Sequence, residues 1–494
     1  MDEVLKSYMA YRTKINAYNY IDYLVSWDSE TEAPKECFKE RSLYLGVLSE
    51  ERYKIQVSDE FNVIVDELSK RNDLDADLAY EVSKMKEDIE KVKKIPMDEY
   101  VAYQVLLAES QNIWAQAKEA DDFDMFAPTL EKIIEFNKKL CKYWETDELK
   151  GYDVLLNEYE KNMTTKEYDV FFNCLKEKLV PFVKIVSSKK LEYSNALKGK
   201  FDIDKQKEFV KYLMDVLCFD KNRGLVKESV HPFTSGYGTN DVRFTVHYYE
   251  DLLISSIFSA IHELGHSIYE QQGNPKYNDT FLSGGVSMAM HESQSRFFEN
   301  IIGRSKEFWS IHYNKLKDIF KEELVDVSLD DFYLHINEVA LQFIRTEADE
   351  LTYPLHIMLR YDLEKMMIDG DLKVNELPDK WNELTKQYLG LDVPNYSLGI
   401  LQDVHWSGGS IGYFPTYALG SAYASQIFAH MQKDFDVLNN LETTQKINEW
   451  LKEKIHIYSS SMESKDIFEN AVGRFDPNYY IDYLIEKYSK VYNI

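Results

Sequence analysis

This sequence is poor in several features that would place it in whole classes of protein. Its 494 residues include only four cysteines, Cys37, Cys141, Cys174 and Cys218, and none of them forms a CxxC pair. Such spacing excludes a zinc knuckle and a dithiol redox motif. We expect four reduced and mostly buried thiols, as in proteins of a reducing compartment.

Basic residues and long apolar runs are scarce as well. Lysine and arginine total 58 against 85 aspartates and glutamates, which gives a net charge of −27. Such an acidic chain repels phosphate backbones, so nucleic acid is not an expected partner. The N-terminus lacks the apolar core of a signal peptide, and no segment approaches the roughly 20 apolar residues that span a bilayer. We therefore expect a cytoplasmic protein with no membrane contact.

The chain also lacks low-complexity linkers and repeats of fixed period, so it marks no sharp domain boundary. A hydrophobic content of 44% is enough for a large core. Apolar residues recur three and four positions apart over most of the chain, which is the helical spacing. Breaks between helices are expected near Pro34, at 71–77, at Pro96 and before Pro128.

One region departs from the helical pattern. Residues 231–250 place Ser, Gly, Thr and Asn before Val, Phe, Thr, Val and Tyr, which is typical of a hairpin or a short strand pair. A helical pattern resumes near residue 251. The predicted fold class is therefore mainly α, with a small β element directly before this helix.

The helix that follows carries an H-E-x-x-H pattern made of His262, Glu263 and His266. Helix positions i and i+4 share a face, so the two imidazoles can bind one zinc ion. Glu263 can then take a proton from a water bound to the ion as this water attacks a carbonyl. Nine of the eleven histidines lie between His231 and His405, which favours a site over a chance match.

A catalytic zinc ion needs a third protein ligand and an open fourth position. Residues 286–300 read as a second helix, and Glu292 lies 292 − 266 = 26 positions after His266. His291 is the alternative ligand. Adjacent helix positions point about 100° apart, so only one of this pair can face the ion. We predict Glu292, the arrangement of thermolysin-like zinc peptidases.

Six motifs follow one another along the chain: HPF (His231–Phe233), DVRFT (Asp241–Thr245), HELGH (His262–His266), HESQ (His291–Gln294), IRTEAD (Ile344–Asp349) and GILQDVHW (Gly399–Trp406). In order and spacing they resemble the signature motifs of the carboxypeptidase Taq family of metallocarboxypeptidases. GYFPTY (412–417) and LVSWDSET (24–31) add to a resemblance that covers nearly the whole chain.

The resemblance implies an enzyme that removes single amino acids from the C-termini of peptides with broad specificity. It implies one Zn²⁺ per chain, with Co²⁺ as an alternative, in a thermolysin-type (gluzincin) site of a long, deep groove. It also implies an almost wholly helical fold and a homodimer. We treat residues 1–494 as one unit, with a helical part at 1–220, the metal and substrate site at 221–430 and C-terminal helices at 431–494.

An enzyme that acts at a C-terminus must recognise a free carboxylate, and the fork of an arginine can pair both of its oxygens. Arg345 in IRTEAD and Arg243 in DVRFT are the candidates. By the resemblance Arg345 is the anchor. The alternative is a structural pair between Arg345 and Asp349, four residues on, and the sequence leaves open which arginine dominates.

Attack on a peptide carbonyl creates an oxyanion that needs donors besides a metal ion. His231, His405 and Tyr417 are the candidates, and by the resemblance they contact the substrate or the intermediate. Tyr417 is expected on a glycine-rich loop, 407–417, that can approach a substrate closely. Tyr413 in the same loop is a further candidate for substrate binding.

Together these residues predict a metallocarboxypeptidase. The same metal site also serves dipeptidyl carboxypeptidases and oligo-endopeptidases, which would release pairs or internal fragments. An inactive helical protein that binds peptides is the alternative from outside the enzymes.

Overall fold

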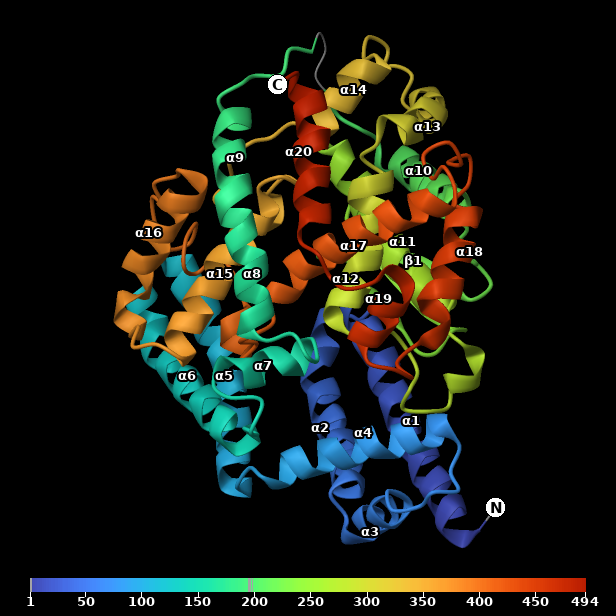
Figure 1. Cartoon of the computed structure of the whole chain (residues 1–494), viewed down its shortest axis with the longest axis vertical. Helices are drawn as coiled ribbons and strands as arrows, with labels where there is room; N and C mark the ends of the chain where they lie inside the picture. Colours follow the sequence, from blue (N-terminus) through green and yellow to red (C-terminus); the bar gives the residue numbers. More distant parts are fainter. Residues whose placement is uncertain (1, 194–196, 198) are drawn as a thin grey trace.

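The computed structural model describes residues 2–193, 197 and 199–494, and helices dominate them (Figure 1). The first half of the chain forms α1 (Glu3–Thr31), η1 (Lys35–Cys37), α2 (Phe38–Gln56), α3 (Asp59–Leu68), α4 (Ala76–Lys93), α5 (Met97–Ala120), α6 (Phe123–Trp144), α7 (Tyr152–Tyr159), α8 (Thr165–Cys174), η2 (Leu175–Leu179), α9 (Val180–Ser187) and α10 (Ile203–Val216).

The second half begins with three strands, β1 (Gly224–Glu228), β2 (Thr234–Gly236) and β3 (Val242–Val246). It then forms α11 (Leu253–Gln271), η3 (Pro275–Tyr277), α12 (Met288–Arg296), η4 (Phe297–Ile302), α13 (Lys306–Ile319), α14 (Leu329–Ile336), η5 (Arg345–Glu347), α15 (Tyr353–Ile368), η6 (Val374–Glu376), α16 (Leu377–Leu389), η7 (His405–Gly408), α17 (Pro415–Asp434), α18 (Gln445–Lys454), η8 (His456–Tyr458), α19 (Ser464–Val472) and α20 (Asn478–Tyr492).

The small sheet confirms the expected hairpin and adds a strand that the sequence pattern did not indicate. β2 and β3 pair antiparallel, with Thr234 opposite Phe244. β1 pairs with β3 in parallel, so the strand order is β1-β3-β2. Three of the five β1 residues are exposed, so the strand lacks the clear apolar alternation that reveals a half-buried strand. β2 and β3 both pack on α11, which places the sheet beside the H-E-x-x-H helix.

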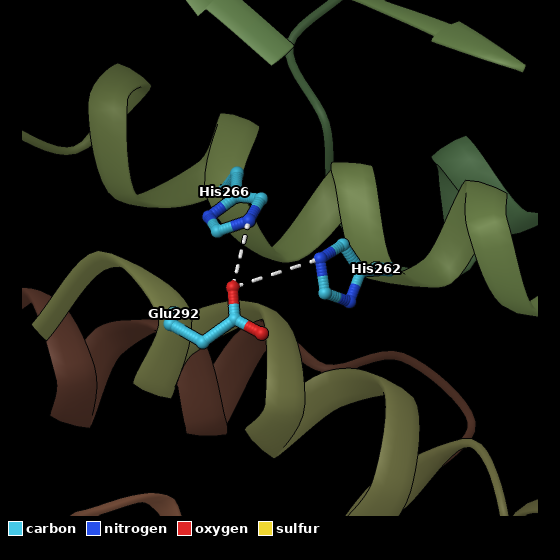
Figure 2. Close-up of side chains that lie close together, drawn as sticks. All are labelled: His262, His266 and Glu292. Carbon is cyan, nitrogen blue, oxygen red and sulfur yellow. Dashed lines mark ion pairs between the residues drawn. The ribbon is translucent and has the colours of Figure 1, made fainter. Parts of the chain in front are cut away.

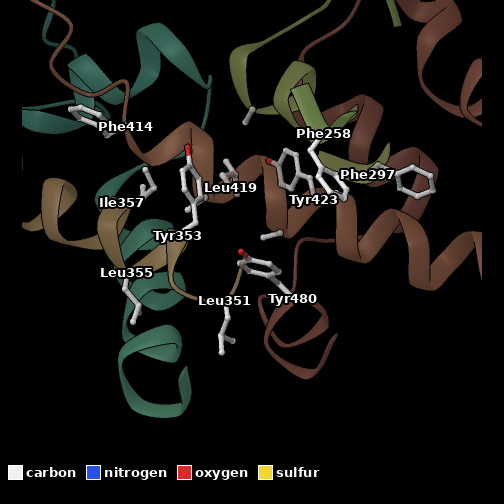
Figure 3. Packing of buried hydrophobic residues seen from close by; sticks show 14 of the residues in the cluster. Phe258, Phe297, Leu351, Tyr353, Leu355, Ile357, Phe414, Leu419, Tyr423 and Tyr480 are labelled. Atoms are coloured by element: carbon white, nitrogen blue, oxygen red, sulfur yellow. The ribbon is translucent and has the colours of Figure 1, made fainter. Parts of the chain in front are cut away.

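Buried side chains form two hydrophobic clusters. The larger one draws on residues between 103 and 492, and the smaller one lies among α1 to α4, between residues 8 and 85. In Figure 1 these four helices occupy the end of the molecule opposite the C-terminus. Figure 3 shows part of the larger cluster, where Tyr353 of α15 lies beside Leu419 of α17. The division of the chain into three parts stays a prediction.

Three of the four expected helix breaks are confirmed and one is displaced. Pro34, residues 71–77 and Pro96 lie at helix boundaries, but Pro128 lies inside α6. That boundary falls earlier, because Asp121 adopts a left-handed φ of 54° at the end of α5 and the side chain of Asp122 caps α6. Local capping, and not the proline, therefore separates these helices.

The four cysteines are free, as expected, but they are not mostly buried. Cys141 is buried, Cys37 and Cys174 are half-buried, and Cys218 is exposed. Cys218 follows the end of α10 with a left-handed φ of 62°, in the turn by which the chain leaves that helix. The expectation of mostly buried thiols was therefore wrong, because two of them lie on partly exposed helix surface and one lies in a turn.

Candidate metal centre and active site

The two predicted ligand helices bring His262, His266 and Glu292 together. One ligand atom from each lies within 4.8 Å of the others. The Oε2 of Glu292 lies 3.9 Å from Nε2 of His262 and 3.7 Å from Nε2 of His266 (Figure 2). Both histidines come from α11, while Glu292 comes from α12, whose first turn is capped by the side chain of Ser287.

Two glycines allow these helices to approach closely. A Cβ on Gly265 of α11 would lie 2.7 Å from the carbonyl oxygen of Gln294 in α12. A Cβ on Gly420 of α17 would lie 2.7 Å from Cβ of Glu292. Neither position has room for a larger residue, so α12 is held between α11 and α17 with Glu292 directed at the histidines.

The largely buried carboxylate of Glu299, in the π-helix η4, orients His262. The Nδ1 of His262 donates to Oε2 of Glu299 at 2.8 Å. Burial alone would raise the pKa of Glu299, but Arg296, His262 and Arg304 hold that pKa well below its ordinary value. Burial likewise disfavours charge on His262, and the bond to Glu299 together with the charge of Glu292 outweighs this and raises the pKa of His262. The Nε2 edge is therefore left facing Glu292.

His266 is oriented by the other ligand candidate. Its Nδ1 lies 2.7 Å from Nδ1 of His291, and the Nε2 of His291 lies 2.7 Å from Oε1 of Glu270. Both ring nitrogens of His291 therefore already have a hydrogen-bond partner, Nδ1 in His266 and Nε2 in Glu270. The structure thus gathers Glu292, and not His291, with the two α11 histidines.

The predicted base lies next to this cluster. Glu263 is buried, and its Oε2 accepts a hydrogen bond of 2.7 Å from the hydroxyl of Thr234 in β2. Burial is the main cause that raises the pKa of Glu263. A raised pKa suits a carboxylate that must take up a proton near neutral pH. β2 thus serves the site by holding this carboxylate in place.

The donor set fits a divalent metal ion. Ligands that share a zinc ion at about 2.0–2.1 Å lie roughly 3.4 Å apart in a tetrahedral arrangement, and the two N–O distances here are 3.7 and 3.9 Å. Arg296 donates to Oε1 of Glu292 at 2.7 Å, which leaves Oε2 towards the imidazoles. Two imidazole nitrogens and one carboxylate oxygen form a typical catalytic set with one open position.

Arg345 lies in a second polar group built around Asp403. Its Nε donates to Oδ1 of Asp403 at 3.0 Å, and the fully buried Arg360 donates to Oδ2 at 2.7 Å. The expected partner Asp349 instead binds the amides of Leu351 and Thr352. The suggested pair between Arg345 and Asp349 was therefore wrong, because Asp349 caps the turn before α15 and Asp403 arrives from a distant segment.

Tyr417 lies over the same guanidinium, and His405 and Tyr413 pack against Tyr417. The ring of Tyr417 lies 5.1 Å from the Arg345 guanidinium carbon, and His405 Nε2 lies 3.4 Å from the Tyr417 hydroxyl. Burial is the main cause that lowers the pKa of His405 to about 4, so this ring is neutral near pH 7. Tyr413 lies in the expected loop and stacks on His405. Tyr417 does not, because Pro415 starts α17 and places it in the first turn.

The remaining candidates lie outside these contacts. Arg243 of β3 forms two hydrogen bonds with Asp241, at 2.6 and 2.8 Å, and its guanidinium lies over Tyr23 and Trp27 of α1. His231 is exposed in the segment before β2. Roles for both in substrate binding or catalysis stay predictions.

A chain of contacts links the metal cluster to the Arg345 group. Arg296 binds Glu292 and lies 4.5 Å from the ring of Tyr353. The hydroxyl of Tyr353 in turn accepts a hydrogen bond of 3.3 Å from Arg345. The two halves of the site are therefore in contact through buried side chains.

Sequence reasoning missed the residues that support the predicted ones, namely Thr234, Glu270, Arg296, Glu299, Tyr353, Arg360 and Asp403. Thr234 directly follows the HPF motif, and Asp403 lies within GILQDVHW. Their place in or next to a motif was a signal that could have identified these two residues. The others lie in helices where a buried polar residue cannot be told from an exposed one by spacing.

Comparison with known proteins agrees with this geometry. The pattern of the carboxypeptidase Taq (M32) metallopeptidase family matches residues 7–488. The chain belongs to this family. It is 42% identical over 486 residues to carboxypeptidase 1 of Bacillus subtilis, with 97% of each chain covered. It is 35% identical over 494 residues to thermostable carboxypeptidase 1 of Pyrococcus furiosus, with 99% of each covered.

The structure of the chain also resembles that of a solved M32 carboxypeptidase. The M32 carboxypeptidase of Deinococcus radiodurans has a TM-score of 0.96 and 30% identity over 100% of both chains. The resemblance inferred from the motifs is confirmed, and the protein is a metallocarboxypeptidase, a hydrolase with a divalent metal and peptide substrates. Within the described residues, no helix combines the length and apolar character needed to cross a membrane.

Proposed function

We propose that this M32 enzyme releases single amino acids from the C-termini of peptides with broad specificity, and that His262, His266 and Glu292 hold one Zn²⁺ ion in a gluzincin-type site of a deep groove. Co²⁺ fits the same donors. When bound, such an ion would supply Lewis-acid chemistry that acidifies water and polarises the scissile carbonyl. We further propose that the enzyme works as a cytoplasmic homodimer.

The charge around Arg345 is the observation that carries the proposal. Two guanidiniums, Arg345 and Arg360, share the carboxylate of Asp403. Burial opposes ionisation of Asp403, but the two arginines hold its pKa well below the ordinary value, so it is charged. Two positive charges against one negative leave a net positive charge beside His405, which is neutral. A free C-terminal carboxylate supplies the missing negative charge.

The arrangement also assigns the other steps to residues of this chain. Glu263, held by Thr234, takes the proton of the attacking water and later passes it to the leaving amine. Tyr417 and neutral His405 can donate to the oxygen that becomes negative, and His231 is a further candidate. Arg345 holds the C-terminal carboxylate, with Tyr413 and Arg243 as the additional substrate contacts that we expect.

The products of a peptide digest test the proposal. A free-acid peptide and its C-terminal amide are incubated with the zinc- or cobalt-loaded protein, and masses are followed over time. We expect a ladder that loses one residue at a time from the free acid, with the amide spared. Loss of residue pairs would indicate a dipeptidyl carboxypeptidase, and internal fragments from both peptides would indicate an endopeptidase. No cleavage by metal-loaded protein would favour a peptide-binding protein.

A further inference from the structure

Three side chains form a continuous line behind the second histidine of the metal cluster. His266 and Glu270 lie one turn apart on α11, and His291 of α12 bridges them. The two hydrogen bonds, His266 Nδ1 to His291 Nδ1 and His291 Nε2 to Glu270 Oε1, are both 2.7 Å long. All three side chains are at least three-quarters buried.

The carboxylate of Glu270, at the end of this line, sets the donor and the acceptor of both hydrogen bonds. A charged carboxylate only accepts hydrogen bonds, so Nε2 of His291 donates to Glu270. A His291 ring that carries its single hydrogen on Nε2 accepts at Nδ1, where it receives the Nδ1 hydrogen of His266. This leaves a lone pair on Nε2 of His266, the nitrogen that faces Glu292. Any other arrangement would place a hydrogen on that nitrogen and prevent it from binding a metal ion.

The surroundings of His291 leave its ring little freedom. The backbone amide of Gly285 donates to the same Oε1 of Glu270 at 3.1 Å. A Cβ on Gly285 would lie 2.6 Å from Cδ2 of His291 and 2.7 Å from the ring of Tyr269. Tyr269 meets the His291 ring edge to face at 5.1 Å, and its hydroxyl accepts from the amide of Val286. The glycine-rich segment before α12 thus encloses the bridging imidazole.

We infer that His291 and Glu270 are positioning residues, which hold His266 with its Nε2 lone pair directed at the metal position. The two ligand imidazoles are then oriented by different contacts. Glu299 orients His262 directly, whereas Glu270 orients His266 only through His291. The inference rests on the metal site of the proposed function and concerns the affinity and geometry of that site, not the peptide that is cleaved.

The test measures Zn²⁺ affinity by competition with a chromophoric chelator, for variants that fold normally by circular dichroism. Replacing groups that orient a ligand typically costs 10- to 100-fold in affinity. His291→Leu is expected to weaken binding by about tenfold or more, and Glu270→Gln by less, because the amide still accepts from His291. His291→Gln is the conservative variant, since its amide can accept from His266 and donate to Glu270, and it is expected to recover most of the affinity.

A double variant separates a relay from two independent contacts. If Glu270 acts through His291, adding Glu270→Gln to His291→Leu produces no further loss. Adding Glu299→Gln instead is expected to produce a further loss, because Glu299 orients a different ligand. The visible absorption spectrum of the Co²⁺-loaded single variants is expected to change in shape, since it reports the arrangement of the ligands.

Two results would overturn the inference. One is unchanged Zn²⁺ affinity and an unchanged Co²⁺ spectrum in His291→Leu. The other is a loss in the double variant equal to the sum of its parts, which would indicate separate structural effects. Failure of the wild-type protein to bind Zn²⁺ at all would overturn the proposed zinc site itself and is seen before any variant is made.

Discussion

At the scale of single residues, several side chains with a proposed chemical role are each held by a second polar group. Glu263 is held by Thr234, Glu292 by Arg296 and Arg345 by Asp403. Such bonds fix rotamers before a substrate arrives, which lowers the entropy lost in reaching a reactive geometry. Single substitutions can therefore separate chemistry from structure.

Glu263→Gln tests the base. The glutamine fits the same space and can still accept the hydrogen bond from Thr234, but it cannot take up a proton. We expect kcat to fall by roughly 100- to 10,000-fold, the usual contribution of a positioned base, with Zn²⁺ affinity unchanged. Steady-state kinetics and metal titration measure the two effects. Undiminished turnover would exclude Glu263 as the base.

Arg345→Met tests the carboxylate anchor. Asp403 keeps its bonds to Arg360, so the change leaves no buried carboxylate without a partner. Loss of a buried charged contact costs about 3 kcal/mol, and kcat/KM for a free-acid peptide should fall about 100-fold. The control is the amidated peptide, on which variant and wild type should be equally slow. An equal loss on both substrates would contradict an anchoring role.

At the scale of elements, the site depends on α12 being held between two other helices. α11 supplies the two imidazoles, α12 supplies Glu292, the proposed third ligand, and α17 packs behind it. The small sheet adds Thr234 next to the base. None of these elements contains the whole site, so its geometry follows from how closely the helices pack.

Gly265→Ala tests this packing. The added methyl group would lie 2.7 Å from backbone atoms of Gln294 and Ser295, so α11 and α12 must separate. We expect a loss of about 1–3 kcal/mol of stability, as for other overpacked positions, together with weaker Zn²⁺ binding. Thermal unfolding and chelator competition measure these. As the control, Gly46→Ala in α2 has no atom within 4 Å of the new Cβ, so it should leave Zn²⁺ affinity unchanged and raise stability by about 0.5–1 kcal/mol. Unchanged Zn²⁺ affinity in Gly265→Ala would show that the crossing tolerates a larger residue.

A buried acid near the start of α12 predicts a pH-dependent stability. Glu160 is fully buried, and desolvation is the main cause that raises its pKa to about 7. A carboxyl whose pKa is raised by folding stabilises the protein below its unfolded pKa of 4.5, and this contribution is lost as the pH rises through about 7.

Glu160→Gln should remove this loss. Because a shift of one pKa unit corresponds to about 1.4 kcal/mol, we expect the variant to gain about 3 kcal/mol over the wild type between pH 4.5 and 8. The difference should be smallest at the acid end. Denaturant unfolding at pH 5 and pH 8 measures it. A difference independent of pH would show that Glu160 does not titrate in this range.

At the scale of the whole molecule, the metal position joins segments that the chain keeps far apart. The contacts that begin at α11 and α12 continue through Tyr353 to Arg345 and Asp403. An ion bound there stabilises only the folded state, because the ligands come together only on folding.

Metal removal should therefore lower both activity and stability. At a free Zn²⁺ concentration 1,000-fold above Kd, the ion adds about 4 kcal/mol, so chelation should lower Tm by several degrees and abolish turnover. Added Zn²⁺ or Co²⁺ should restore both. The control is His266→Ala, whose Tm should not respond to zinc at this concentration. A zinc-dependent Tm in that variant would place the ion elsewhere.

The sequence by itself determined the features that depend on neighbouring residues. Helical spacing placed His262 and His266 on one face and predicted a mainly helical chain, while prolines and turn residues predicted three of the helix boundaries. The order of motifs identified the family and selected Glu292. The helical, boundary and family predictions are confirmed because a turn of helix, a cap or a motif is written in residues that are close together in the chain. The role of Glu292 as a metal ligand stays a prediction.

Only the tertiary structure decided which polar side chains meet. It paired Arg345 with Asp403 in place of Asp349, turned His291 towards His266 and Glu270, placed Tyr417 on a helix and added β1 to the hairpin. Each outcome depends on segments that are distant in sequence and arrive at the same place only when the core packs. A residue's periodicity indicates that it faces inward, but the atom it meets there is set by the other elements of the fold.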